Sequence, residues 1–186
     1  MKRLIHSSMS VAPFLALAVL MPSVAGATTY RQTISPDGVL QATKPFQSFG
    51  NLSHIGDCQY ETDANMILSQ WPKAKITTSE VVHAYNVNGS QQDSNGLWAG
   101  QNYLITHGFD GHRATSIVAV TPSQIHGLTQ VMNLGPVRMH TFFIIWSNSK
   151  QLITVDDGYV NRYNWAEFNS DYTQQGETLT YYAVSF

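Results

Sequence analysis

Cys58 is the only cysteine of the 186-residue chain, and it stands where a helical pattern begins. Backbone N–H groups in the first turn of a helix have no partner within the helix, so they stabilise a thiolate there. A thiolate can act as a nucleophile when a histidine lies beside it and a polar group orients that histidine. The competing interpretation is that Cys58 is a small buried packing residue.

His140 has the least usual surroundings of the seven histidines. It lies in residues 136–146, whose β-branched and aromatic side chains predict a strand, and a polar ring is out of keeping there. The other histidines lie in the leader, in loops, near helical patterns or, for His112, at the start of a predicted strand, and surface or core-edge positions are favoured for those in loops and helical patterns. They are His6, His54, His83, His107, His112 and His126.

A pair of acids follows the next predicted strand. Residues 147–150 are typical of a turn and residues 151–157 of a strand, so the hairpin brings Asp156 or Asp157 back beside His140. A carboxylate there can fix the histidine tautomer and stabilise the imidazolium. The alternative is that Asp-Asp-Gly forms only a turn.

Helical patterns precede these strands. Ala64, Ile67, Leu68 and Trp71 would share one face of a helix that Pro72 ends. Capping sequences predict further helices after Thr77, Ser94 and Thr121. The expected helices are residues 58–71, one after 77, 94–108 and 121–135.

The remaining elements are mostly strands. We expect strands at residues 112–120, 136–146, 151–157 and 178–186, and a short helix at 165–168. Residues 28–49 are typical of an irregular arm or a strand that wraps the domain. Helices first and antiparallel strands second predict an α+β fold, with the N-terminal helices packed on one side of a C-terminal antiparallel sheet.

The N-terminus has the layout of a bacterial secretory signal peptide. Lys2 and Arg3 precede an apolar run at residues 11–19 and a small-residue cleavage site at 25–27. Cleavage would leave one domain, residues 28–186, secreted or periplasmic and without a membrane anchor. The loss of Lys2 and Arg3 leaves 8 basic against 12 acidic residues, a net charge of −4. The absence of a basic run argues against nucleic-acid binding.

The order of these motifs resembles that of the papain-like cysteine peptidase superfamily. The shared features are Gly56-Asp57-Cys58 at a helix start, Gly135-Pro136-Val137 before a strand histidine, and Ile153-Thr154-Val155-x-Asp157-Gly158. Within the superfamily, the layout is similar to that of short members such as the bacteriocin-processing double-glycine peptidases. The resemblance covers about residues 51–168. It implies a papain-like fold and an enzyme that cleaves amide bonds of a protein or peptide, without a cofactor.

The resemblance also implies a role for each candidate residue. Cys58 would be the nucleophile, and His140 the general base and acid. Spacing from the histidine favours Asp156 as the orienting acid, whereas alternation along the strand and the following turn residue favour Asp157, which we prefer.

The oxyanion-binding residue departs from the family pattern. The family usually has a glutamine a little before the cysteine, where this chain has Leu52. Asn51 carries the same amide chemistry and is our candidate. Gln47 would reach the site only if the loop folds back.

Two other functions fit parts of the sequence. A binding module without turnover would suit the missing glutamine and an exposed aromatic surface formed by Trp98, Tyr159, Tyr163 and Trp165. A cysteine-type cell-wall amidase or a deamidase uses the same chemistry, but such amidases more often read Asp-Cys-Ser-Gly than Asp57-Cys58-Gln59-Tyr60. No ligand spacing such as His-Glu-x-x-His occurs, so we expect no metal.

Overall fold

The computed structural model describes residues 46–49, 57–136, 139–173 and 176–186. These residues form four α-helices, one 3-10 helix and a six-stranded antiparallel sheet, so the predicted α+β class is confirmed. The predicted signal peptide, and the arm before residue 46, lie outside the described residues.

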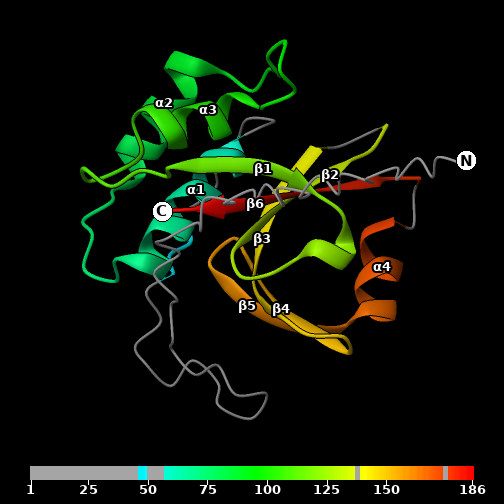
Figure 1. The fold of residues 1–186 in the computed structure, drawn as a ribbon. Coiled ribbons are helices and arrows are strands. Elements are labelled where there is room, and N and C mark those ends of the chain that lie inside the picture. The colour runs from blue at the N-terminus through cyan, green and yellow to red at the C-terminus, as the bar shows by residue number, and fades with distance from the viewer. Residues whose placement is uncertain (1–45, 50–56, 137–138, 174–175) are drawn as a thin grey trace, which may run out of the picture.

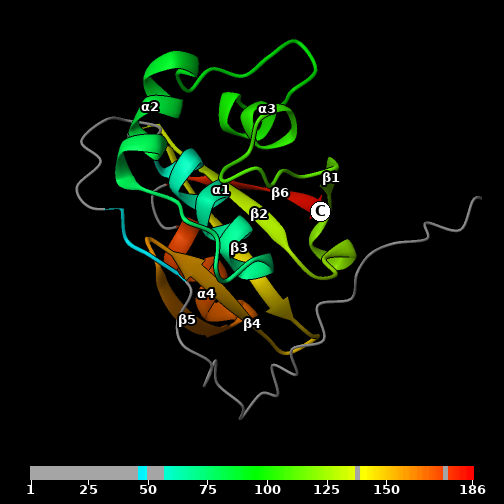
Figure 2. The same ribbon diagram turned by 90° about the vertical axis from the view of Figure 1, so that its left-hand side faces the viewer.

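Three helices cover one face of the sheet (Figures 1 and 2): α1 is Asp57–Gln70, α2 is Thr78–Asn88 and α3 is Ala99–Thr106. The predicted capping box at the start of α2 is present, because Glu80 N–H donates to the Thr77 hydroxyl and the Glu80 carboxylate accepts from Thr77 N–H. α1 packs against α2, α3 and the sheet. The helix that begins beside Cys58 is therefore the central helix of this layer.

The sheet has the strand order β1-β6-β2-β3-β4-β5. Its central strand β3 is buried on both faces, since Phe143 and Ile145 belong to the core under α1 while Phe142 and Ile144 belong to a second core. The strands are β1 Ser116–Val120, β2 Thr129–Leu134, β3 Met139–Ser147, β4 Gln151–Asp156, β5 Tyr159–Asn164 and β6 Thr178–Ser185.

Helix α4, Trp165–Thr173, covers the second core. Its side chains Phe168 and Tyr172 pack against Phe142 of β3, with the Tyr172 and Phe142 rings stacked at a centroid distance of 4.5 Å. The N-terminal helices α1 to α3 thus lie on one side of the sheet, as expected, while α4 lies on the other. The same helix was predicted to end at Phe168, five residues short of Thr173.

The predicted helix at residues 121–135 was also wrong. The capping box of Thr121 and Gln124 forms, but it closes only a 3-10 turn, Pro122–Gln124, before Ile125 becomes extended. Gly127 then adopts a positive φ of 84°, and residues 129–134 form strand β2 between β3 and β6. A good helix start is overridden here because Val131 and Met132 are each buried in a different core.

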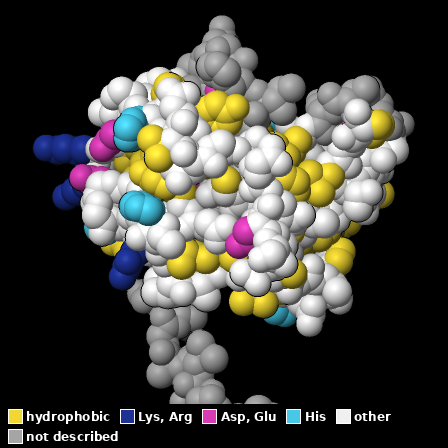
Figure 3. Space-filling view, turned by 90° about the horizontal axis from the view of Figure 1, so that it is seen from above, with side chains coloured by type: hydrophobic (Ala, Val, Ile, Leu, Met, Phe, Trp, Pro, Cys, Tyr) yellow, Lys and Arg dark blue, Asp and Glu magenta, His cyan; other side chains and the backbone are white. Residues whose placement is uncertain are grey.

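The surface is sparsely charged, as expected from a chain with 12% charged residues. Seen from above, the few charged side chains lie mostly toward one edge of the view (Figure 3). No helix in the described ranges has the length and apolar character needed to cross a membrane.

A buried polar chain ties β2 to the helices. Gln101 of α3 donates to Gln130 of β2 at 2.7 Å, and Gln130 donates to Asp63 of α1 at 2.9 Å. All three side chains have 0% relative exposure. Burial raises the pKa of Asp63 well above its usual value, although the hydrogen bond from Gln130 lowers it, so the folded protein favours the protonated acid.

We predict that Asp63→Asn gains stability relative to wild type as the pH rises. The folded wild type keeps a proton that the unfolded chain releases above its ordinary pKa near 4, so the wild type loses stability as the pH rises. The asparagine of the variant can still accept from Gln130 but does not titrate. Urea unfolding at pH 5 and pH 8 should show the difference moving by about 1 kcal/mol or more toward the variant. A constant difference would contradict a proton on Asp63.

Candidate active site

Cys58 is the second residue of α1, as the sequence predicts. Gln59 to Ser69 are all buried, whereas Cys58 is only half-buried. The thiol therefore keeps partial access to solvent in the first turn of an otherwise buried helix, where unpaired N–H groups favour a negative charge.

A buried hydrogen bond joins this helix to the strand that carries the candidate histidine. The Thr62 hydroxyl donates to the backbone carbonyl of Thr141 at 2.8 Å. Thr62 lies one turn after Cys58, and Thr141 follows His140 directly. The bond thereby fixes the first turn of α1 against the beginning of β3.

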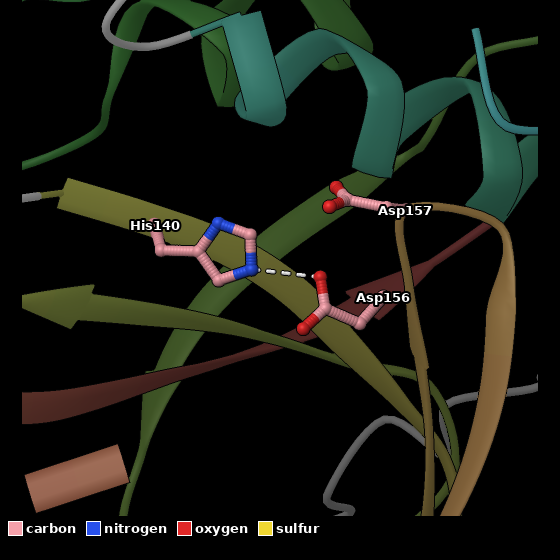
Figure 4. A group of neighbouring side chains, drawn as sticks. All are labelled: His140, Asp156 and Asp157. Atoms are coloured by element: carbon pink, nitrogen blue, oxygen red, sulfur yellow. Dashed lines mark hydrogen bonds and ion pairs between the residues drawn. The ribbon is translucent and has the colours of Figure 1, made fainter. Parts of the chain in front are cut away.

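His140 forms hydrogen bonds with a carboxylate and with a thiol, the two kinds of partner expected from the sequence. Its Nε2 lies 2.7 Å from Asp156 Oδ1, and its Nδ1 points toward α1 (Figure 4). The Cys58 side chain makes a hydrogen bond with the imidazole. Cys58, His140 and Asp156 therefore form a continuous hydrogen-bonded chain from α1 through β3 to β4.

The acid in this chain is Asp156, the alternative, and not Asp157, which we preferred. Phe143 pairs with Val155, so one step further along the same register Asp156 comes opposite Phe142, on the face of β3 that His140 shares. The alternation used to favour Asp157 follows the residues that face α1. Asp157 lies nearby in the turn, with a φ of 46°, and its carboxylate makes no hydrogen bond to His140.

The pKa of His140 reflects its two partners. Burial is the largest effect and lowers the pKa, but the hydrogen bonds with Asp156 and Cys58 and the negative charge of both groups raise it to about 10. The imidazole is thus favoured in its protonated form at neutral pH.

Tyr172 is a site residue that the sequence analysis missed. Its hydroxyl donates to Asp156 Oδ2 at 3.0 Å, while Asp156 Oδ1 faces His140. Burial, together with the charge of Asp156, raises the pKa of Tyr172, so the hydroxyl stays protonated. No sequence signal pointed to it, because it lies in the part of α4 that was not predicted.

Glu61 was also missed, although its spacing could have revealed it, because it follows Cys58 by one helical turn. Its side chain has 5% relative exposure, and Oε1 has no hydrogen-bond partner among the described residues. Burial and the charges of Asp157 and Asp156 raise the pKa of Glu61 to about 7, against the lowering effect of the Phe49 N–H and His140. Glu61 is therefore a buried acid that interacts with Asp157 and has one oxygen without a hydrogen-bond partner among the described residues.

The candidate oxyanion residue Asn51 lies outside the described residues, as does Leu52. The Asn65 side chain of α1 makes two hydrogen bonds with the Gln47 backbone, each 2.9 Å long. It accepts from the Gln47 N–H and donates to the Gln47 carbonyl. Asn65 is two turns beyond Cys58, roughly 10 Å along the helix axis. The segment at Gln47 thus folds back along α1, but the hydrogen bonds to Asn65 hold the Gln47 backbone well away from the Cys58 thiol.

Comparison with known proteins gives no assignment. No protein-family model matches this sequence, and no curated protein matches it significantly. The function of the site therefore has to be argued from the arrangement of Cys58, His140 and Asp156.

We predict that Asp156→Asn lowers the pKa of His140 more than Asp157→Asn does. Only Asp156 shares a hydrogen bond with the ring, so its neutralisation removes both a bond and a charge. NMR titration of the imidazole should give a wild-type midpoint near 10, against an ordinary value of 6.5. Since the folded pKa is raised, the stability that this pair contributes is complete below about pH 6.5 and is lost as the pH passes 10. Equal shifts in the two variants would contradict the assignment of Asp156.

We predict that Tyr172→Phe slows alkylation of Cys58 by iodoacetamide at pH 6 about fivefold. The substitution keeps the ring that stacks on Phe142 but removes a hydrogen bond to a charged acceptor, which is worth about 1 kcal/mol or more. The matched control is Tyr181→Phe, which removes a buried hydroxyl in the same core. Equal rates in Tyr172→Phe and wild type would show that the hydroxyl does not support Asp156.

Proposed function

We propose that this protein is an exported papain-like cysteine peptidase that cleaves amide bonds through an acyl-enzyme. The observation that supports the proposal is the chain from Cys58 through His140 to Asp156, with a nucleophile at a helix N-terminus, a base beside it and an acid 2.7 Å from the base. A single histidine placed between a thiol and a carboxylate has the arrangement that nucleophilic catalysis needs.

Each residue has one task in the reaction. The Cys58 sulfur attacks the carbonyl carbon of the amide, and the imidazolium of His140 gives its proton to the leaving amine as the C–N bond breaks. His140 then takes a proton from water, which attacks the thioester and releases the acid. Asp156 keeps the ring oriented throughout and stabilises its positive charge.

The fold supports the same proposal. A central helix with a cysteine at its start packs against an antiparallel sheet that carries the histidine and the acid, which is the layout that the sequence resemblance implies. The oxyanion would form at the N-terminal end of α1, beside the unpaired N–H groups of its first turn, with the Asn51 amide as a candidate donor.

The chemistry of the triad suits several kinds of amide bond. The steps above apply to peptide bonds, to isopeptide bonds and to the side-chain amide of glutamine. Export through the predicted signal peptide would bring the enzyme to proteins and peptides outside the cytoplasm, so we propose a protein or peptide substrate.

We predict that iodoacetamide labels the folded protein at pH 6 at least about tenfold faster than it labels His140→Ala. An ordinary thiol with a pKa near 8.5 is less than about 1% thiolate at this pH, whereas a thiolate paired with imidazolium is reactive. Because Cys58 is the only cysteine, mass spectrometry of the intact chain reports this one site.

The control variant is His126→Ala, which removes an exposed histidine that takes no part in the Cys58–His140–Asp156 chain. Rapid labelling of wild type and His126→Ala, with slow labelling of His140→Ala, supports the peptidase. A Cys58 that reacts only after unfolding, or equally fast without His140, would rule the peptidase out and favour a binding module.

A further inference from the structure

Asp157 lies beside the candidate catalytic histidine but has no task in the proposed reaction. One oxygen of its carboxylate, one oxygen of Asp156 and a ring nitrogen of His140 all lie within 4.8 Å of one another. Figure 4 shows the Asp157 side chain pointing back toward the imidazole, nearer to α1 than Asp156 is. A substrate bound against Cys58 and His140 would therefore lie beside the Asp157 carboxylate.

Asp157 differs from the other acids at the site because it is accessible and has no partner. Asp157 is exposed, whereas Glu61 is buried. Asp156 is half-buried, and each of its oxygens already accepts a hydrogen bond. Among the described residues, no lysine or arginine pairs with Asp157, and its carboxylate accepts no hydrogen bond. Asp157 can therefore bind a group that arrives from solution.

The backbone fixes the turn that carries this acid. Asp157 and Gly158 have φ values of 46° and 76°, and a Cβ on Gly158 would lie 2.5 Å from the backbone carbon of Gln47. Only glycine fits against that segment, which Asn65 in turn holds to α1. The turn is therefore held in one position relative to α1, and so relative to Cys58.

The charges at the site favour a cationic partner. In the reactive form, the imidazolium of His140 is the one positive group beside the Cys58 thiolate and the carboxylates of Asp156 and Asp157. Burial and the charge of Asp156 raise the pKa of Asp157, while His140 lowers it. A positive group beside Asp157 would offset this excess of negative charge, whereas a negative group would add to it.

We propose that Asp157 selects substrates that carry a lysine or arginine side chain next to the scissile amide bond. The inference rests on the proposed function, because the substrate has to bind against Cys58 and His140. The ammonium or guanidinium group donates charge-assisted hydrogen bonds to the Asp157 carboxylate. Asp157 is thus a specificity-determining residue, whereas Asp156 orients the imidazole.

The local charge is tested first, with two methanethiosulfonate reagents that modify Cys58 and differ in charge. We measure the rate constant of the cationic trimethylammonium-ethyl reagent divided by that of the anionic sulfonatoethyl reagent, at pH 7.5 and low ionic strength. This ratio cancels any change in the thiolate itself. It should fall at least about fivefold in Asp157→Asn, because one negative charge beside the thiol is removed. Asparagine tolerates the positive φ of this position, so the variant keeps the turn.

Two controls accompany the reagent test. Asp171→Asn removes an exposed acid of α4, so it changes the net charge equally and should keep the wild-type ratio. Salt at about 0.5 M should bring the ratios of wild type and Asp157→Asn together, because it screens exposed charges. A ratio that is equal in wild type and Asp157→Asn at low salt would overturn the inference.

Substrate selection is tested with a library of peptides made by cutting bacterial proteins after glutamate, which leaves lysine and arginine within the peptides. Mass spectrometry of the products should show lysine or arginine enriched at least about threefold at a position adjoining the bonds that wild type cleaves. The enrichment should disappear among the bonds that Asp157→Asn cleaves.

The results separate this inference from the proposed function. Cleavage by wild type without a preference for lysine or arginine would reject the role of Asp157 and leave the peptidase. A reagent ratio that depends on Asp157, in a protein that cleaves no peptide, would keep the charge selection at Cys58 and reject the peptidase.

Discussion

The packing of α1 on β3 decides whether this chain has a reactive centre, because it sets the separation of Cys58 and His140. The two residues lie far apart in the sequence, and the buried bond from Thr62 to the Thr141 carbonyl joins their elements within one turn of the thiol and one residue of the imidazole. Breaking a buried bond of this kind leaves a polar group unsatisfied, which costs about 1–3 kcal/mol. The same interaction that stabilises the core therefore positions the site.

Burial lowers the pKa of His140 and negative charge raises it. This balance gives the second core a role at the site. Taking the ring out of water disfavours its charged form, so a partly buried histidine alone would be neutral. Asp156 reverses this, but only if its carboxylate stays ionised and in place. Tyr172 supplies the second bond to that carboxylate, and its own position depends on the stack with Phe142. The core under α4 thus supports the acid as well as the sheet.

The sequence predicted the parts of the site that depend on local patterns. A cysteine at a helix start, a histidine in an apolar strand and acids at the end of a hairpin can all be recognised from neighbouring residues. The choice between Asp156 and Asp157 could not, because it depends on which face of β3 carries His140, and both faces of that strand are buried. Strand β2 was mistaken for a helix for a related reason: the capping box at Thr121 is local, whereas the pairing of residues 129–134 with β3 and β6 is not.

Consecutive acids on one turn have different surroundings, and this follows from strand geometry. Asp156 is the last residue of β4 and continues the row of side chains on the His140 face of the sheet, whereas Asp157 lies in the turn beyond the strand, with a φ of 46°, and is exposed. The first acid meets a hydrogen-bond donor on each oxygen. The charge of the second raises the pKa of Glu61, a buried acid of α1. One acid is therefore held by two hydrogen bonds, whereas burial and the charge of the first raise the pKa of the other.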